Sequence, residues 1–338
     1  MDTNTPLIIN GMCVPVLKPS CSYRYLGIDF SPEGIVYEAP KITTLLDRLD
    51  RAPLKPFQRL YILRNFAIPT LQQKLVLGKA YRKSVGHLDG EVRRAVRKWL
   101  KLPKYTALSG LHASIRVGGL GVPHIASIVF SSKNARFAAL SNSTDPVVRL
   151  ASETQHVRKV YGIAFRLKYT SESQKAHWAS KIGNNLDTKG IKGIEAVPAV
   201  NRCLYTPDCG GHMSGKDFVN SMKVRLGCLE TPVRQSRGGR PVDTKCKCGG
   251  DKGASGQHII QGCPVTHGLR VRRHVNIVKY IERTAKCDGR DIIREARVMT
   301  ETGLCKPDLV LHYANRVIIV DVQVRAATDM RDLEMAHR

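Results

Sequence analysis

Two different periods of apolar residues divide the chain into segments. Residues 1–38 hold short β-rich runs, "SYRYLGIDF" and "IVY", on either side of the turn sequence "SPEG". From residue 41 to residue 102 apolar residues recur at intervals of three and four, the period of helices that bury one face. Pro53, Pro56 and Pro69 predict breaks between these helices, because proline lacks the N–H that a helix interior needs. We therefore expect a small β-rich segment followed by a group of helices.

The sequence "LDGEVRRAVRKWLKLP" predicts an amphipathic helix that ends at Pro103. Its apolar face comprises Val92, Val96, Trp99 and Leu100. Its basic face comprises Arg93, Arg94, Arg97, Lys98 and Lys101. Such a face suits a phosphate backbone, although an ordinary solvated face has the same pattern. Arg93, Arg97 and Lys101 are our candidates for phosphate contacts.

The middle of the chain gives weaker signals. "RVGGLGVPHI" reads as a turn that enters a helix, since no strand or Lys-Ser/Thr context supports a phosphate loop. Residues 126–230 look mostly helical, with a polar interruption at "KIGNNLDTKGIKGI". "RQSRGGRP", residues 234–241, predicts a basic, flexible linker and a domain boundary.

The stretch "CKCGGDKGASGQHIIQGC" holds three cysteines and a histidine, and Cys₃His is a closed ligand set for zinc. The glycines after Cys248 permit a tight turn that brings its thiolate close to that of Cys246. His258 and Cys263 are spaced to close on one short helix or turn. The single residue between the first two cysteines is fewer than the usual two to four. The alternative is a set of free buried thiols with a satisfied histidine, but four candidate ligands in one short polar segment argue against a core.

The segment "KPDLVLHYANRVIIVDVQV" predicts a β-hairpin, with apolar runs on either side of the turn "ANR". Asp308 opens the first strand and Asp321 follows the second, so both lie at the open end of the hairpin. Two carboxylates placed in this way can share a divalent cation that activates water against a phosphodiester. Solvated aspartates at strand ends would give the same pattern, and the spacing does not distinguish the two.

Charge narrows the choice of partner. The chain has 54 Lys and Arg against 28 Asp and Glu, a formal net charge of +26, which favours a polyanion and nucleic acid before membrane. No run of 18 apolar residues predicts a membrane span, and the start of the sequence does not resemble a signal peptide. The irregularly spaced cysteines are typical of reduced thiols in an intracellular protein.

The order of these motifs carries a family resemblance. After the Cys₃His motif come "THGLRVRRHVNIV", "KPDLV" and "VIIVDVQV". This series resembles the polyprotein of site-specific non-LTR (type-1) retrotransposons, the clade that inserts into large-subunit ribosomal RNA genes and carries a restriction-like endonuclease. "YRYLGIDFSPEG" resembles the strand that closes the reverse-transcriptase palm and helps to hold the primer. "LKPFQRLYILRNFAIPTLQQKLVLG" and "DGEVRRAVRKWLKLP" are similar to the thumb, and "DFVNSMKVRLGCLETPVRQSRGGRP" resembles the segment before the knuckle.

The resemblance implies an α+β, multidomain fold with five parts. These are the end of a palm (1–38), a helical thumb (39–125), a mostly helical linker region (126–240), a zinc knuckle (241–268) and the start of a restriction-like α/β nuclease (269–338). It implies Zn²⁺ in the knuckle, Mg²⁺ in the nuclease and in the polymerase, and RNA template and target DNA as partners. Action would be in the nucleus.

Family roles carry over to matching residues only. Cys246, Cys248, His258 and Cys263 match the knuckle; Asp308 and Asp321 match the metal ligands of the nuclease, and Glu295 matches an upstream acidic position. The residues expected to contact nucleic acid are Tyr25, Arg93, Arg97, Lys101, Arg270, Arg272, Arg273 and Lys306.

The family's polymerase aspartates stand on a Tyr-x-Asp-Asp turn that this sequence lacks, and Gln323 stands where many such nucleases have lysine. We therefore expect a piece of a longer polyprotein that makes no DNA from RNA by itself. The rival interpretations are a non-enzymatic zinc-knuckle protein that derives from a transposon and binds nucleic acid, and a free-standing metal-dependent nuclease.

Overall fold

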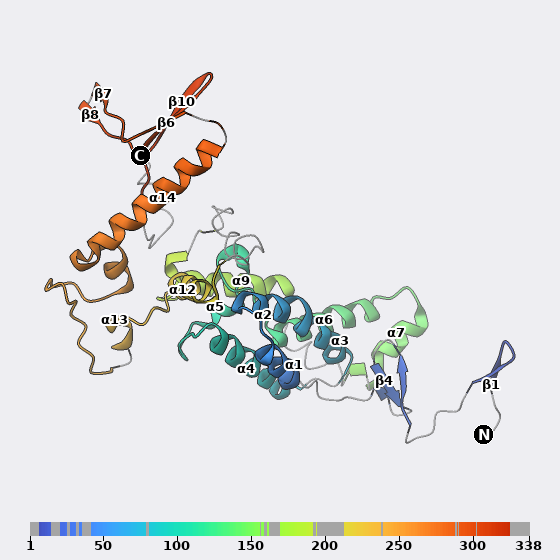
Figure 1. Cartoon of the computed structure of the whole chain (residues 1–338). Coiled ribbons are helices and arrows are strands. Elements are labelled where there is room, and N and C mark those ends of the chain that lie inside the picture. Colours follow the sequence, from blue (N-terminus) through green and yellow to red (C-terminus); the bar gives the residue numbers. More distant parts are fainter. Residues whose placement is uncertain are drawn as a thin grey trace. The chain divides into compact units, whose positions relative to one another are not determined.

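A computed structural model describes the protein over residues 7–14, 21–25, 28–31, 34–35, 42–78, 81–155, 157–158, 161, 170–191, 194, 213–237, 239–287, 289, 291–301 and 303–324. The chain mixes helices and sheets and forms two compact units, Met1–Cys228 and Leu229–Arg338 (Figure 1). The division falls just before the linker expected at residues 234–241.

The N-terminal segment consists of short antiparallel strands. Strands β1 (Leu7–Ile9) and β2 (Met12–Val14) form a hairpin. Its turn residues Asn10 and Gly11 have φ of 50° and 78°, as a two-residue hairpin turn requires. Strands β3 (Tyr23–Tyr25), β4 (Ile28–Ser31) and β5 (Gly34–Ile35) pair in that order. Ser31 pairs with Gly34 on either side of the turn expected at "SPEG", whose residues 32 and 33 lie outside the described part of the chain.

The first helices follow the apolar period. Helix α1 (Ile42–Arg51) ends before Pro53, and α2 (Pro56–Ile62) begins at Pro56, so two of the three expected breaks are confirmed. The break expected at Pro69 is wrong. The π-helical turn η1 (Leu63–Ala67) and α3 (Ile68–Leu77) follow α2 without a gap. The π turn shifts the hydrogen-bond pattern just before the proline, so its missing N–H does not end the helix.

Helix α4 (Arg82–Trp99) carries the amphipathic pattern that the sequence predicts. Val92, Val96 and Leu100 have no exposed surface, and Trp99 is 4% exposed. They pack in one core with buried residues of α1, α2, α3 and the later helices. This core holds the helical part of the first unit together.

The structure describes further helices in the first unit. They are α5 (Leu108–His112), the 3₁₀ turn η2 (Ile115–Val117), α6 (Ile125–Ser141), α7 (Pro146–Glu153), α9 (Ser171–Asn184), the 3₁₀ turn η3 (Lys189–Ile191) and α12 (Gly215–Arg225). Of these, α5, α6 and α12 contribute to that core, whereas Ile182 of α9 and Ile191 of η3 pack in a separate small cluster. The end of α9 at Asn184 falls inside the interruption expected at "KIGNNLDTKGIKGI".

The glycine-rich turn before α6 is a packed structural turn. The N–H groups of Leu120, Gly121 and Val122 donate to backbone carbonyls of residues 110, 113 and 111 at 2.8–2.9 Å. At Gly119 a Cβ atom would lie 2.2 Å from the Ala113 carbonyl oxygen, so only glycine fits. The N–H groups of this turn are therefore used within the fold, as expected for a turn that enters a helix.

In its described residues the second unit contains helices followed by short strands. It contains α13 (Pro232–Gln235), the π-helical turn η5 (His258–Gly262), the 3₁₀ turn η6 (Pro264–Thr266) and α14 (His267–Cys287). Its strands are β6 (Asp291–Arg294), β7 (Val298–Thr300), β8 (Gly303–Cys305), β9 (Leu309–Tyr313) and β10 (Arg316–Val320). Strands β10, β9 and β6 form an antiparallel sheet with β9 in the centre, and β7 pairs with β8.

Helix α14 joins the region of η5 to this sheet (Figure 1). Val278 and Ala285 of α14 pack with Leu309 and Leu311 of β9 in a small buried core. Among the helices in the described part of the chain, none has the length and apolarity needed to span a bilayer.

Asp89 joins α4 to the start of α6, and its loss is expected to destabilise the first unit. Its side chain is 1% exposed and accepts hydrogen bonds from the N–H groups of Ile125 and Ala126 at 2.7 and 3.0 Å. Burial raises the pKa of this carboxyl, although His124 and the two N–H groups favour its charged form. Asp89→Ala leaves two helix-start N–H groups without their acceptor, so we expect the free energy of unfolding to fall by about 2–4 kcal/mol.

Asp145 offers the matched control for this prediction. Its exposed side chain caps α7 by accepting from the Val147 N–H at 2.8 Å, so Asp145→Ala is expected to cost only about 1 kcal/mol. Denaturant unfolding of both variants gives the comparison. Equal losses in the two would show that burial adds nothing to the Asp89 contact.

His112 predicts a pH dependence of stability. Its ring is 7% exposed, Nδ1 donates to the Val122 carbonyl oxygen at 2.9 Å, and burial lowers the pKa of the imidazole from 6.5 to about 3. Below pH 6.5 the unfolded chain binds a proton at this residue, whereas the folded chain binds it only near pH 3. The free energy of unfolding therefore decreases as the pH falls from 6.5 towards 3. Between pH 7 and 4.5 the loss from this residue should be roughly 2–3 kcal/mol.

The measurement compares wild type with His112→Phe, which does not titrate. As the pH falls, the unfolding free energy of wild type should decrease more steeply than that of His112→Phe, because only wild type carries the His112 loss. Replacing the exposed His87 by Phe provides the control and should leave the pH slope nearly unchanged. Parallel curves for wild type and His112→Phe would refute the assignment.

Candidate metal centre and nucleic-acid interface

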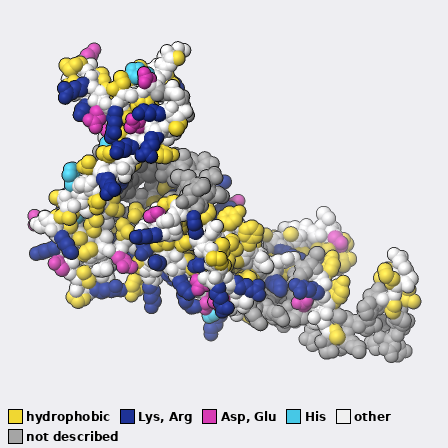
Figure 2. All heavy atoms as spheres, viewed as in Figure 1, with side chains coloured by type: hydrophobic (Ala, Val, Ile, Leu, Met, Phe, Trp, Pro, Cys, Tyr) yellow, Lys and Arg dark blue, Asp and Glu magenta, His cyan; other side chains and the backbone are white. Residues whose placement is uncertain are grey.

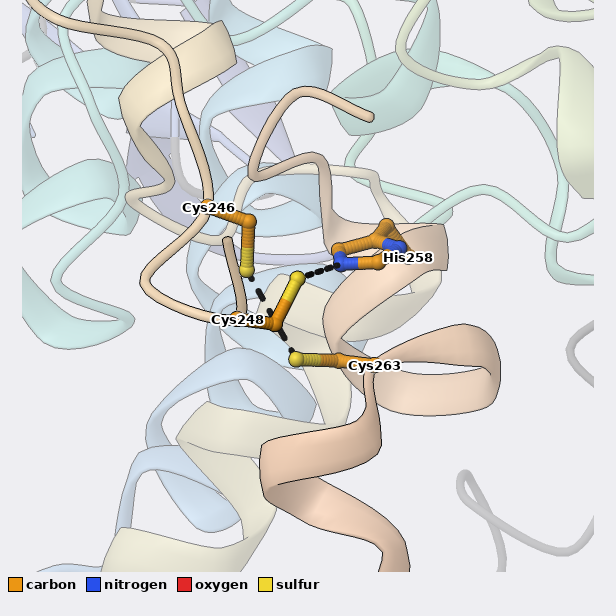
Figure 3. Close-up of side chains that lie close together, drawn as sticks. All are labelled: Cys246, Cys248, His258 and Cys263. Carbon is orange, nitrogen blue, oxygen red and sulfur yellow. Dashed lines mark hydrogen bonds between the residues drawn. The ribbon is translucent and has the colours of Figure 1, made fainter. Parts of the chain in front are cut away.

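The four predicted zinc ligands converge at the start of the second unit (Figure 3). Cys246 and Cys248 stand on a tight turn in which the Gly249 N–H donates to the Cys246 carbonyl oxygen at 3.2 Å. Gly249 has φ of 75°, a conformation that suits glycine. His258 begins the turn η5 and Cys263 follows it, and the Cys263 N–H donates to the His258 carbonyl oxygen at 2.8 Å. Both elements expected from the glycine and spacing patterns are present.

Two pairs of donor atoms have the separations expected around a tetrahedral zinc ion. All four lie within 4.8 Å of one another. The sulfur atoms of Cys246 and Cys263 are 3.6 Å apart, and Cys248 Sγ lies 3.5 Å from His258 Nε2. With bond lengths of about 2.3 Å to sulfur and 2.0 Å to nitrogen, ligand atoms around one Zn²⁺ lie about 3.5–3.8 Å apart. The one-residue gap between the first two cysteines is therefore compatible with zinc.

The thiols of the cluster influence each other's ionisation. Burial opposes ionisation of Cys263, but hydrogen bonds from Cys246 and from the N–H groups of Val265 and Thr266 outweigh it and lower the pKa of this thiol. At Cys246 a backbone hydrogen bond from Cys248 favours the thiolate, yet burial and the neighbouring thiols together raise the pKa. Of these two thiols, Cys263 is therefore the more readily ionised, and the thiolate is the form that ligates metal.

The predicted carboxylates lie where the hairpin opens. In the antiparallel pair of β9 and β10, Leu309 is opposite Val320, so Asp308 and Asp321 continue the two strands at the same end. Asp308 is partly buried, and Asp321 is exposed. The hairpin and the common end of these residues are confirmed.

The partners of Asp308 and Glu295 complete this end of the sheet. Asp308 accepts from the Val322 N–H at 2.7 Å and lies 3.0 Å from His274 Nε2. The Glu295 N–H donates to the backbone oxygen of Asp308 at 3.1 Å, and the Glu295 carboxylate pairs with Lys306 at 3.0 Å. The hydrogen bond from Lys306 is the main cause that lowers the pKa of Glu295. In the described part of the chain, one group of three or more His, Cys, Asp or Glu side chains lies close enough together to hold a metal ion. This group is the Cys₃His cluster.

The basic residues assigned to nucleic acid differ in exposure. Tyr25, Lys101, Arg272 and Lys306 are exposed. Arg93 lines a pocket of about 220 Å³ together with Asp89 and His124. The side chains of Arg270, Arg273 and Arg97 are partly buried, and Arg270 donates to the Gln261 carbonyl oxygen.

Arg97 does not lie on one exposed basic face with Lys98 and Lys101. It contacts the Thr106 carbonyl oxygen at 3.4 Å, and burial lowers the pKa of its guanidinium. The five cations of the predicted face divide instead into the half-buried pair Arg93 and Arg97 and the exposed set Arg94, Lys98 and Lys101. The reason is that positions four apart share a side of the helix, and on this side Arg93 lies by the start of α6 while Arg97 reaches the Thr106 carbonyl oxygen. Lys and Arg side chains nevertheless dominate the charged surface in view (Figure 2).

Two residues at the carboxylate end were not singled out from the sequence, His274 and Val322. His274 lies four residues before Val278 and eleven before Ala285, on the side of α14 that packs on the sheet. His274 could have been identified from the sequence by its spacing. It has the helical spacing of the apolar residues Val278 and Ala285, in the helix that precedes the expected acidic pair.

Comparison with known proteins agrees with these features. No family model matches the chain. It is 31% identical, over 96% of its length, to the Retrovirus-related Pol polyprotein from type-2 retrotransposable element R2DM of Drosophila melanogaster. It is 30% identical, over its whole length, to the Pol polyprotein from type-1 retrotransposable element R2 of Nasonia vitripennis. A Pol polyprotein from an R2 element of Popillia japonica is 27% identical over 95% of the chain and is covered over 67% of its own length.

The chain spans 31% and 32% of the Drosophila and Nasonia polyproteins, about a third of each. The matches nevertheless extend over nearly all of this sequence, including the Cys₃His cluster and the hairpin. The chain is therefore homologous, over nearly its whole length, to part of the Pol polyproteins of R2 retrotransposable elements.

Proposed function

We propose that this chain serves in a polyprotein that nicks target DNA and copies its own RNA from the exposed 3′ end. The R2 relatives support this proposal, since each is a retrotransposon Pol polyprotein. Insertion into chromosomal DNA implies action in the nucleus. The two nucleic acids involved are the RNA template and the target DNA.

Each part of the chain has a role in this proposal. Residues 1–38 form the end of the palm, where the exposed Tyr25 contacts the primer, and residues 39–125 form the thumb that holds primer and template. Residues 126–240 link the thumb to the knuckle at 241–268, which binds nucleic acid. Residues 269–338 begin the nuclease.

The observation that carries the nuclease half is the register of β9 and β10. It brings Asp308 and Asp321, thirteen positions apart, to one end of a sheet whose central strand is buried. When bound there, Mg²⁺ would supply a water of lowered pKa and neutralise charge on the scissile phosphate. Asp308 and Asp321 would hold the ion through their oxygens, with Glu295 beside them.

The knuckle and the exposed cations bind and orient the nucleic acids. The Cys₃His residues would hold zinc, which would fix the turn before α14, and basic residues lie in the first part of this helix. Arg272 and Lys306 are exposed in this unit and are suited to the DNA backbone, as Lys101 is in the thumb. Arg97 contributes to the thumb through its packing and its contact with Thr106, because it is partly buried.

The test uses the whole polyprotein with duplex target DNA, element RNA, deoxynucleotides and Mg²⁺. The expected product is complementary DNA joined covalently to the 3′ end of the nicked strand, and its formation should require the RNA. Nicked DNA without any RNA-dependent extension would contradict the proposal. So would complementary DNA that is never joined to the target strand.

A further inference from the structure

The most specific contact that the activity proposed above does not use is between helix α14 and strand β9. His274 Nε2 lies 3.0 Å from Asp308 Oδ1, and the Val322 N–H donates to Asp308 Oδ2 at 2.7 Å. An ionised carboxylate only accepts hydrogen bonds, so His274 is the donor in this pair. One oxygen is therefore held from the helix and the other from the chain that follows β10.

The position of His274 on α14 explains why it reaches the carboxylate. Val278, Ile281 and Ala285 lie on the same helix side and pack against the sheet. His274 is one turn before them, so it meets the sheet where β9 begins, next to Asp308. The apolar contacts of the helix thus fix the position of the imidazole ring. Both side chains of the pair are mostly shielded from solvent, since 35% of His274 and 18% of Asp308 are exposed.

We propose that His274 is a positioning residue, which together with the Val322 N–H fixes the Asp308 carboxylate in the orientation that binds a divalent cation. This inference rests on the function proposed above. Each carboxylate oxygen has a second lone pair, so both remain able to face a cation while the two hydrogen bonds hold the group. Asp321, in contrast to the partly buried Asp308, is exposed to solvent. It would supply the second carboxylate ligand from the end of the neighbouring strand.

Hydrogen-bond partners of ligands in metal sites fix ligand orientation, and their loss typically weakens metal affinity by about 10- to 100-fold. We expect His274→Ala to weaken Mn²⁺ binding at this site by roughly tenfold. His274→Gln should restore most of the affinity, because the glutamine amide places an N–H donor near the position of Nε2. His312, exposed on β9, provides the control variant His312→Gln, which should bind as wild type does.

The first measurement needs no metal. Amide hydrogen exchange at Val322, followed by NMR on the deuterated chain, reports how firmly Asp308 accepts its N–H. It should be roughly tenfold faster in His274→Ala, because a hydrogen bond to a charged group is lost from the carboxylate. It should stay near wild type in His274→Gln and His312→Gln. Unchanged exchange in a folded His274→Ala protein would overturn the positioning role.

The second measurement is Mn²⁺ binding, followed by electron paramagnetic resonance, in wild type, His274→Ala and Asp321→Ala. If Asp321→Ala lowers binding and His274→Ala does not, the positioning role is wrong while the metal site stands. If Asp321→Ala leaves Mn²⁺ binding as in wild type, the proposed metal site fails, and Val322 exchange still decides whether His274 holds Asp308. Binding lowered by both variants, together with faster Val322 exchange in His274→Ala alone, supports the proposal.

Discussion

Replacing Cys248 by Ser or His258 by Ala is expected to release one tightly bound zinc ion per chain and to unfold the segment from residue 241 to residue 268. The physical reason is that this segment has little core of its own. Cys263 and Ala254 are its buried apolar residues, and the two pairs of ligands stand on separate turns. Structural zinc in such small modules contributes on the order of 10 kcal/mol to folding.

Zinc per chain, measured by atomic spectroscopy on protein purified without chelators, gives the first result. Limited proteolysis then reports whether residues 241–268 have become accessible. Cys287→Ser is the matched control, because Cys287 is exposed at the end of α14 and outside the cluster. Wild-type protein without zinc would remove the hypothesis, and zinc retained in both ligand variants would assign the ion to other residues.

Asp308→Ala and Asp321→Ala are each expected to lower the rate of target-DNA nicking by about a hundredfold or more. A metal ion in a phosphodiester-cleaving site stabilises the transition state by several kcal/mol, and each lost ligand weakens or misplaces it. Nicking of a labelled duplex by the whole polyprotein measures this rate. Asp291→Ala is the control, because Asp291 lies at the other end of β6, opposite His312. Its nicking should remain near wild type, and equal loss in all three variants would indicate damage to the sheet.

The elements that local chemistry determines could be predicted from the sequence. The apolar period located α4 and its buried residues Val92, Val96 and Trp99 because a one-sided stripe must face a core. The hairpin of Asp308 and Asp321 followed from two β-branched runs around a short turn. The Cys₃His cluster followed from ligand types and turn glycines, since both lie within 18 residues of sequence.

Features that depend on tertiary packing could not be predicted in the same way. Pro69 was expected to break a helix, but the π turn before it shifts the hydrogen bonds and absorbs its effect. Arg97 carries the charge of a surface residue, yet it is partly buried and lies near Thr106 and Cys228, and no local pattern predicts that Cys228 lies beside this helix. The contact of His274 with Asp308 joins residues 34 positions apart and follows from the packing of α14 on the sheet.

The central claim is that one polyprotein uses two different sites. The carboxylates of this chain cleave the DNA, and a separate polymerase site copies the RNA. The most direct test of this claim is the ratio of RNA-templated extension on a pre-nicked duplex to nicking of the intact duplex, measured for Asp321→Ala and for wild type. The account predicts that this ratio rises by about a hundredfold or more, because cleavage loses a metal ligand while the polymerase keeps its own site. A ratio equal to that of wild type would contradict it.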